Sequence, residues 1–246
     1  MATVLNDYVL TRPLTEVIPG IADVCEMKEI KSIIEDTPME VEVTKDSFTE
    51  AVEEMPRLCD EWRISRSRDL IIMMQVGTEE SIKTETVPEV DIDLSSLELA
   101  TTWFHCWNCT EPIGYPRVLV HGHATSFRYG SRIEASVDHF QNLGCEVWNH
   151  RGDRVWFYTQ AHAAARPIIA ACGLDPDVAT AREMDELEPM IECLTCYNIE
   201  IRYNLDTGRH AMRWRRAVRP FAHSARCQPV TCTDSAYADP PHAHRA

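Results

Sequence analysis

Three features of this 246-residue sequence predict an α+β fold. Apolar residues recur at helical spacing in the first third of the chain, short β-prone runs between turn residues follow, and two Cys-x-x-Cys pairs accompany those runs. The hydrophobic share of 44% and the charged share of 26% are typical of a folded protein with a substantial core. We therefore expect a helical, acidic N-terminal segment and a small mixed α/β domain that a metal stabilises.

Changes in composition divide the chain into four parts. Residues 1–77 form the predicted helical segment, and residues 78–94 are polar, acidic and contain Pro88, which is typical of a linker. Residues 95–226 hold both Cys-x-x-Cys pairs and form the predicted metal-binding domain. Residues 227–246 show no hydrophobic periodicity, and we expect a disordered tail there.

The N-terminal segment contains three predicted helices after a looped or extended start. Two prolines within residues 1–25 break any long helix there. Asp23 is a candidate cap for a helix over residues 26–35, whose isoleucines recur at helical spacing. Thr44 or Asp46 caps a second helix to about residue 54. A proline suited to the first turn begins the third helix, which covers residues 56–75.

The second part has its own local signals. The turn-forming sequence Asn149-His-Arg-Gly152 lies between two apolar runs and predicts a hairpin over residues 147–158. Alanine-rich sequence predicts a helix over residues 159–172. Thr180 and Glu183 have the spacing of a capping box and predict a short helix after them, and residues 212–218 form a final predicted helix.

The net charge of −15 is concentrated in the first 100 residues. That part carries 23 acidic and 9 basic residues, a net of −14, whereas the rest carries 16 and 15, a net of −1. Such a field repels phosphates and anionic membrane surfaces, so we expect neither nucleic acid nor a membrane as a partner. Seven arginines between residues 201 and 226 form a basic island without an aromatic platform. This predicts a solvated helix face or a patch that docks on the acidic half.

Targeting signals are not recognisable in the sequence. No apolar run approaches the roughly 20 residues that a membrane span requires, and the first residues lack a basic stretch followed by an apolar one. We therefore expect an intracellular protein of the cytoplasm or nucleus. In such a reducing compartment disulfides are rare, so metal binding is the better explanation of paired cysteines among the ten in the chain.

The two Cys-x-x-Cys pairs predict a structural zinc site. Two thiolates at this spacing occupy two corners of a tetrahedron around Zn²⁺. Two groupings of ligands are open: either each pair completes its own site with later histidines, or both pairs share one ion and residues 110–192 are inserted between them. Spacing favours separate sites for the first pair but leaves the second short of ligands. The candidate ligands are Cys106, Cys109, His121, His123, Cys193 and Cys196, with His210 or His223 completing a separate second site.

Catalytic signatures are missing from the sequence. It contains no nucleophile elbow, phosphate-binding glycine loop, zinc-protease helix or deaminase motif, and no acid accompanies either cysteine pair at useful spacing. We therefore predict a protein that is not an enzyme, with no small-molecule substrate. A zinc-dependent hydrolase or a thiol redox protein using one pair is the alternative. An open coordination position on the metal would distinguish that alternative from a structural site.

Short motifs spread over residues 8–219 carry a resemblance to a known group of proteins. They are Leu10-Thr-Arg-Pro13, Val24-Cys25, Ser47-Phe48, Met55-Pro56, Glu61-Trp62-Arg63, Phe104-His-Cys-Trp-Asn-Cys109, Tyr115-Pro-Arg-Val-Leu-Val-His121 and Met212-Arg-Trp-Arg-Arg-Ala-Val218. In these motifs the chain resembles the C-terminal part of a large group of uncharacterised proteins from mushroom-forming (basidiomycete) fungi, many of which begin with an F-box.

This resemblance implies a binding module for a protein partner whose identity the residues do not reveal. The group has a His-x-Cys-like pair after the first cysteine pair, which corresponds to His121 and His123 here. After the second pair it has a Trp-x-x-Ala-x-x-His pattern, of which Trp214 and Ala217 match while Pro220 stands at the histidine position. That departure argues against a second complete site. No F-box is recognisable, so we expect that this chain does not itself recruit a ubiquitin-ligase scaffold.

Overall fold

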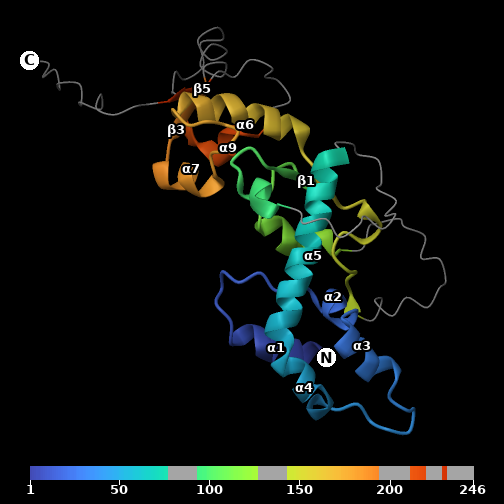
Figure 1. The fold of residues 1–246 in the computed structure, drawn as a ribbon. Helices are drawn as coiled ribbons and strands as arrows, with labels where there is room; N and C mark the ends of the chain where they lie inside the picture. The colour runs from blue at the N-terminus through green and yellow to red at the C-terminus, as the bar shows by residue number, and fades with distance from the viewer. Residues whose placement is uncertain (77–92, 127–142, 194–210, 220–228, 232–246) are drawn as a thin grey trace, which may run out of the picture.

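A computed structural model of the chain shows a mainly helical N-terminal half beside a second half with two small antiparallel sheets (Figure 1). This arrangement confirms the α+β class. The structure describes residues 1–76, 93–126, 143–193, 211–219 and 229–231. The predicted linker 78–94 lies almost wholly outside the described residues, and so does the predicted tail 227–246 except for residues 229–231. Both remain predictions.

The N-terminal half is built from short helices around one long helix. In chain order these elements are α1 (Ala2–Leu10), α2 (Ile21–Cys25), α3 (Lys28–Glu35), the 3-10 helix η1 (Lys45–Phe48), α4 (Thr49–Glu53) and α5 (Met55–Val76). The three predicted helices of this half are confirmed as α3, the pair η1 and α4, and α5. No helix in the described stretches is both long enough and apolar enough to cross a membrane.

The prediction of a looped start was wrong, because two helices lie within residues 1–25. Pro13 and Pro19 fall between α1 and α2 and interrupt neither. α1 forms because its Val4, Leu5 and Tyr8 are buried in a cluster with the beginning of α5. Burial of one apolar face commonly decides whether a short helix forms.

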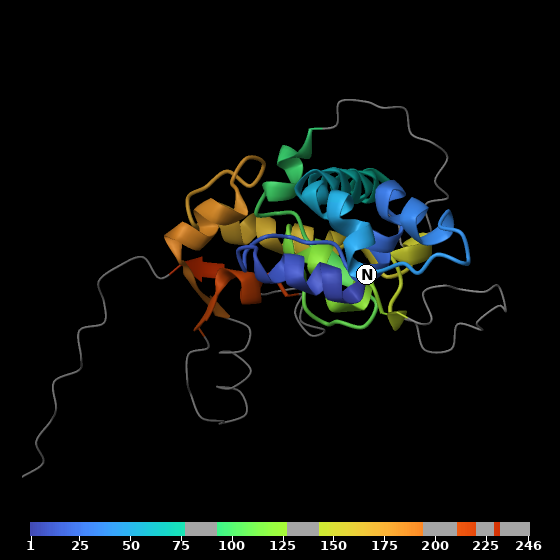
Figure 2. The same cartoon turned by 90° about the horizontal axis from the view of Figure 1, so that it is seen from below.

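α5 connects the two halves of the molecule. Its first turns contribute Met55 and Leu58 to the N-terminal core, and its last turns contribute Leu70 to a second core. That second core includes Phe104 and Val118 from beyond the predicted linker. Figure 2, which shows α5 nearly end-on, displays segments of the second half beside it. Residues on the two sides of the predicted boundary therefore share one hydrophobic core.

The first sheet of the second half joins strands that are distant in sequence. β1 (Phe104–Cys106) pairs antiparallel with β2 (Val155–Phe157), with Cys106 opposite Val155. The predicted hairpin over residues 147–158 was therefore wrong. The turn exists, because Asn149 adopts a left-handed conformation with φ 49° and its side chain accepts hydrogen bonds from Arg154 N at 2.9 Å and Val155 N at 3.0 Å. Trp148 is buried in the core instead of forming a strand.

The C-terminal part packs helices against the second sheet. Its elements are α6 (Thr159–Ala171), α7 (Ala181–Leu187), β3 (Met190–Cys193), β4 (Ala211–Arg213), α9 (Trp214–Ala217) and β5 (Pro229–Thr231), with strand order β4-β3-β5. The capping box is confirmed, because Thr180 Oγ1 accepts from Glu183 N at 3.2 Å and the Glu183 carboxylate accepts from Thr180 N at 2.7 Å. The predicted helix 212–218 begins later, because Met212 pairs with Ile191 in the sheet.

Part of the basic island is described, and its contacts lie within the second half. The Arg215 guanidinium lies 4.7 Å from the centre of the Trp214 ring, and Arg215 Nη2 is 2.5 Å from an Asp185 oxygen. Arg219 pairs with Glu111 at 3.0 Å. These arginines therefore bind acidic residues next to them rather than the acidic N-terminal segment.

Asp23 does not cap α3 as expected, because it lies inside α2 and is 6% exposed. Trp62 Nε1 of α5 donates to Asp23 Oδ1 at 2.9 Å, and Trp148 N donates to both carboxylate oxygens at 3.1 Å. Burial raises the pKa of Asp23, while the hydrogen bonds from the two tryptophans oppose that rise. The Asp23 carboxylate of α2 is therefore hydrogen-bonded both to α5 and to the segment before β2.

Replacing Trp62 by Phe removes the indole donor while keeping an aromatic ring. The Asp23 carboxylate then loses one of its donors, and we expect unfolding free energy to fall by about 1–3 kcal/mol. Urea denaturation measures this change. Trp156→Phe is the matched control, because the half-buried Trp156 ring contacts His105 and donates no described hydrogen bond. Equal losses of unfolding free energy in the two variants would show that the hydrogen bond to Asp23 does not stabilise the fold.

Candidate metal centre

Four of the predicted ligands meet at one point in the second half. Cys106, Cys109, His121 and His123 each place one ligand atom so that all four atoms lie within 4.8 Å of one another. Cys106 is fully buried, and the other three are partly exposed. The described residues thus bring the first cysteine pair together with its two following histidines, as the separate-site grouping expects.

The cysteine side of the cluster is a tight turn at the end of β1. Cys109 N donates to Cys106 O at 3.1 Å, and Asn108 N donates to Cys106 Sγ at 3.4 Å. Trp107 N donates to Arg154 O at 3.1 Å, which holds the turn against the residue preceding β2. The turn therefore brings the sulfur atoms of Cys106 and Cys109 within 4.8 Å of each other.

The histidine side is held by the core below it. His121 lies between two 3-10 helices, η3 (Arg117–Val120) and η4 (Gly122–Ala124). The indole of Trp148 donates to Val118 O at 3.0 Å, and Asn149 N donates to Ala124 O at 2.8 Å. Val118 and Ala124 are buried. The core therefore holds the histidine segment on both sides.

The distances fit a tetrahedral zinc ion. Cys109 Sγ lies 3.4 Å from His121 Nε2 and 3.2 Å from His123 Nδ1. Zn–S bonds of about 2.3 Å and Zn–N bonds of about 2.0–2.1 Å place sulfur and nitrogen roughly 3.5 Å apart on a tetrahedral edge. Two thiolates and two imidazoles are a common donor set for structural zinc. The residues present therefore fit the ion that the sequence predicts.

The pKa values of Cys109 and His121 shift in opposite directions. Burial and the neighbouring Cys106 together raise the pKa of Cys109 to about 11. Burial, His123 and Arg117 lower the pKa of His121, so that its imidazole is neutral and able to ligate near pH 7. Binding of zinc to Cys109 must release the thiol proton, which couples metal affinity to pH.

Asn108 contacts the cluster, and the sequence analysis did not single it out. Its side-chain nitrogen lies 3.1 Å from His123 Nε2. If His123 ligates through Nδ1, its Nε2 carries a proton and requires an acceptor. The Asn108 amide oxygen supplies one when the amide turns by a half rotation. Partners of this kind orient metal-bound histidines, and the adjacent position of Asn108 in the Cys-x-x-Cys turn was the available signal.

His105 lies outside the cluster, in agreement with its position next to Cys106 on a strand. Neighbouring residues of a strand point to opposite faces. The His105 ring lies 5.0 Å from the Trp156 ring and 4.8 Å from the Tyr158 ring, measured between centroids. His105 is therefore part of an aromatic group on the other face of the small sheet.

The second cysteine pair is not tested by the described residues. Cys193 is the last residue of β3, whereas Cys196, His210 and His223 lie outside the described residues. A second separate site and a site shared by four cysteines both remain predictions.

No family model, curated protein or solved structure matches this chain. The resemblance to fungal F-box-bearing proteins accordingly remains an expectation from its motifs.

The raised pKa of Cys109 predicts how stability without metal depends on pH. The folded state holds the thiol proton up to about pH 11, whereas the unfolded thiol loses it near its ordinary value of 9.0. Stability from this group is therefore complete below pH 9 and is lost as pH rises toward 11. We expect metal-free wild-type protein to lose more unfolding free energy across this range than metal-free Cys109→Ser. Parallel losses in chemical denaturation would contradict the raised pKa.

Asn108 can be tested by its hydrogen-bonding role. Asn108→Ala removes the partner of His123, and we expect zinc affinity to fall by about tenfold. Asn108→Asp retains an acceptor and should keep near wild-type affinity. Competition with a chromophoric chelator measures both values. A loss of equal size in both variants would show that Asn108 acts on the turn and not through His123.

Proposed function

We propose that this chain is a zinc-stabilised protein-interaction module without catalytic activity. The convergence of Cys106, Cys109, His121 and His123 within 4.8 Å carries the proposal. Four protein ligands fill a tetrahedral zinc ion and leave no position for a water molecule. A zinc enzyme requires such an open position. The ligand set therefore favours a structural role.

The surroundings of the cluster support the same role. The negative charge of Glu111 contributes to the raised pKa of Cys109. Glu111 also forms an ion pair with Arg219 at 3.0 Å, so its carboxylate is already engaged. Redox enzymes use a cysteine whose pKa is lowered so that the reactive thiolate is present. The pKa of Cys109 is raised instead. For the first cysteine pair, these observations disfavour the two alternatives, a zinc hydrolase and a thiol redox protein.

Kinship with F-box substrate receptors of fungi is the basis for proposing a protein partner. The resemblance covers most of the chain and includes the motif from Phe104 to Cys109 that supplies two ligands. In this proposal the zinc ion holds β1 and the histidine segment together, and the folded module presents a surface to the partner. Partner identity and cellular compartment are questions for experiment.

Metal analysis with X-ray absorption spectroscopy tests the structural role. We expect bound zinc with two sulfur and two nitrogen ligands, and Cys106→Ser should lose that zinc and lower the stability of the second half, because metal binding and folding are coupled. Cys172→Ser is the matched control, since Cys172 is a half-buried cysteine outside the cluster. A spectrum with three protein ligands and a water oxygen would favour the hydrolase alternative.

The second cysteine pair separates the two ligand groupings. In separate sites, Cys193→Ser with Cys196→Ser leaves the zinc of the first pair in place. Loss of all zinc in this double variant would support one ion shared by four cysteines.

A further inference from the structure

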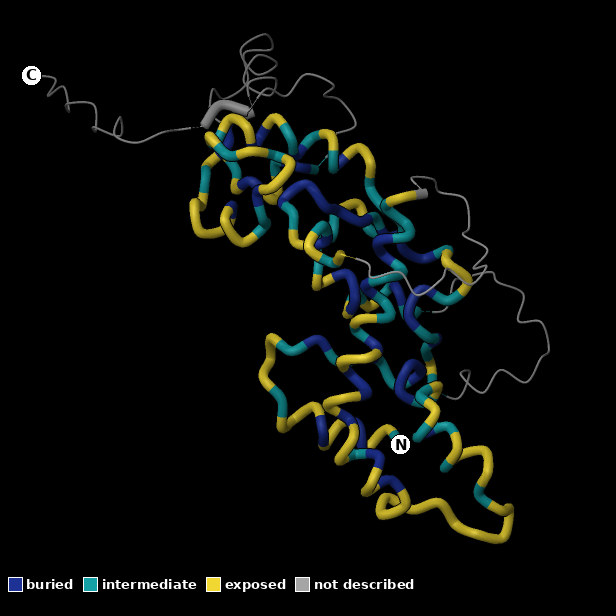
Figure 3. The backbone as a smooth tube through the Cα atoms, in the orientation of Figure 1, coloured by how far each residue is buried: buried dark blue, intermediate teal, exposed yellow. Residues whose placement is uncertain are grey.

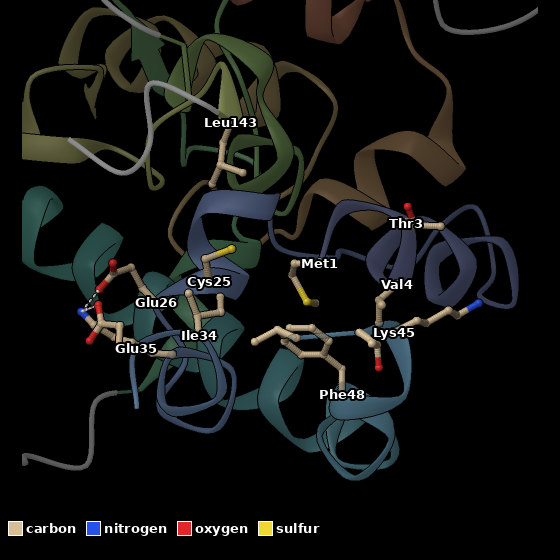
Figure 4. Close-up of a pocket in the computed structure, with 13 residues that line it drawn as sticks. Met1, Thr3, Val4, Cys25, Glu26, Ile34, Glu35, Lys45, Phe48 and Leu143 are labelled. Atoms are coloured by element: carbon tan, nitrogen blue, oxygen red, sulfur yellow. Dashed lines mark hydrogen bonds and ion pairs between the residues drawn. The ribbon is translucent and has the colours of Figure 1, made fainter. Parts of the chain in front are cut away.

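A cavity of about 810 Å³ lies in the N-terminal half and shares no residue with the metal centre (Figure 4). It opens between α1, α3 and η1, and Leu143 approaches it from the second half. Its volume is within the range of sites that bind ligands. Its apolar walls come from Met1, Val4, Ile34, Val43, Phe48 and Leu143.

Exposed apolar side chains continue from the cavity along the loop between α3 and η1. Val43 in the cavity wall is 38% exposed, Val41 is 55% exposed and Met39 is 96% exposed. Figure 3 shows this loop as an exposed stretch at the lower end of the molecule. Single exposed apolar residues are ordinary, but a group of them beside an apolar cavity is typical of an interaction site.

The surroundings of the cavity are strongly acidic. Residues 26–54 contain ten acidic and three basic residues, a net charge of −7. The two lysines that line the cavity are already paired, Lys31 with Glu26 at 2.8 Å and Lys45 with Asp7 at 2.5 Å. Exposed carboxylates without an ion pair in the described part of the chain remain nearby, at Asp36, Glu40 and Glu42.

We propose that this cavity binds a basic amphipathic segment of a partner protein. Apolar side chains of the partner enter the cavity, and its lysines and arginines meet the acidic residues around it. This inference rests on the proposed function, because it names the surface and the chemistry of the protein partner. Apolar anchors surrounded by complementary charge are the usual composition of such a contact.

A second copy of this chain is a poorer occupant. Its described basic element is α9, whose Trp214 is 2% exposed and whose neighbour Val218 is fully buried. α9 therefore offers charge without apolar side chains that could enter the cavity.

The probe is a fluorescent synthetic peptide with leucines on one helical face and lysines on the other, titrated into the zinc-loaded full chain. A second peptide carries glutamates in place of the lysines. We expect the lysine peptide to bind at least about tenfold more tightly, with affinity that falls as salt rises. No binding of the lysine peptide, or equal binding of both peptides, would overturn the proposal.

Val43→Asp separates cavity binding from general attraction to an acidic protein. It makes the chain more negative, so non-specific attraction of the lysine peptide increases, whereas entry of leucines into the cavity is impaired. We expect affinity to fall by at least about fivefold. Unchanged or tighter binding would overturn the proposal, because the apolar wall would then play no part.

Charge reversal near the cavity has an equally charged control. Glu40→Lys with Glu42→Lys should weaken binding of the lysine peptide by at least about fivefold. Glu98→Lys with Glu186→Lys changes net charge equally at exposed positions elsewhere and should change affinity by less than about twofold. Equal losses in the two double variants would assign binding to net charge alone and overturn the proposal.

Two further measurements keep the outcomes distinct. Zinc content of each variant should stay at the wild-type value, because none of the changed residues belongs to the metal cluster. Retained zinc without peptide binding would defeat the cavity proposal and leave the structural zinc intact. Sedimentation of the wild-type chain alone should show a monomer. A dimer that disappears in Val43→Asp would identify a second copy of the chain as the occupant of the cavity and would overturn the proposal.

Discussion

The buried carboxylate of Asp23 fixes the position of the metal-binding segments relative to the N-terminal helices. It accepts from the Trp62 indole of α5 and from the backbone N of Trp148. The Trp148 indole in turn donates to Val118 O in η3, the element that immediately precedes His121. A buried carboxylate destabilises the folded state unless hydrogen-bond donors surround it. The segments that carry Trp62 and Trp148 therefore have to pack against Asp23 in the folded protein.

The metal centre depends on the same framework from a second direction. The backbone carbonyl of Arg154 accepts a hydrogen bond from Trp107 N in the cysteine turn. The Arg154 side chain, which is 3% exposed, forms an ion pair with the buried Glu146. β1 and β2 each have three residues, and an isolated two-stranded sheet is marginal in water. A zinc ion across the Cys106 turn and the histidine segment would provide a covalent-like link where hydrogen bonds are few.

Local signals predicted most of the helices but missed α1 and α2, and the strand pairing depends on residues far apart in the sequence. The capping box at Thr180 and the apolar spacing of α5 require only neighbouring residues, and both predictions were confirmed. Pairing of β1 with β2 depends on residues far apart in sequence, and the turn at Asn149 therefore suggested the wrong partner. The local sequence around Asp23 suggested a helix cap. Its actual hydrogen-bond donors, Trp62 and Trp148, come from distant segments that local sequence does not reveal. The cluster of Cys106, Cys109, His121 and His123 was predictable from their close spacing in the sequence, whereas the predicted ligands Cys193 and Cys196 remain untested.

The cavity and the metal centre lie in different parts of the fold, and α5 is the element that spans them. Its first turns pack beneath α1 and η1, which wall the cavity, and its last turns share a core with the elements that carry the metal ligands. Trp62 lies between these ends and binds Asp23. The N-terminal cluster has its own buried apolar residues and includes none of the four candidate metal ligands. Among the described residues that line the cavity, Leu143 is the one that lies beyond α5 in the sequence, so the cavity is built almost wholly by the N-terminal half.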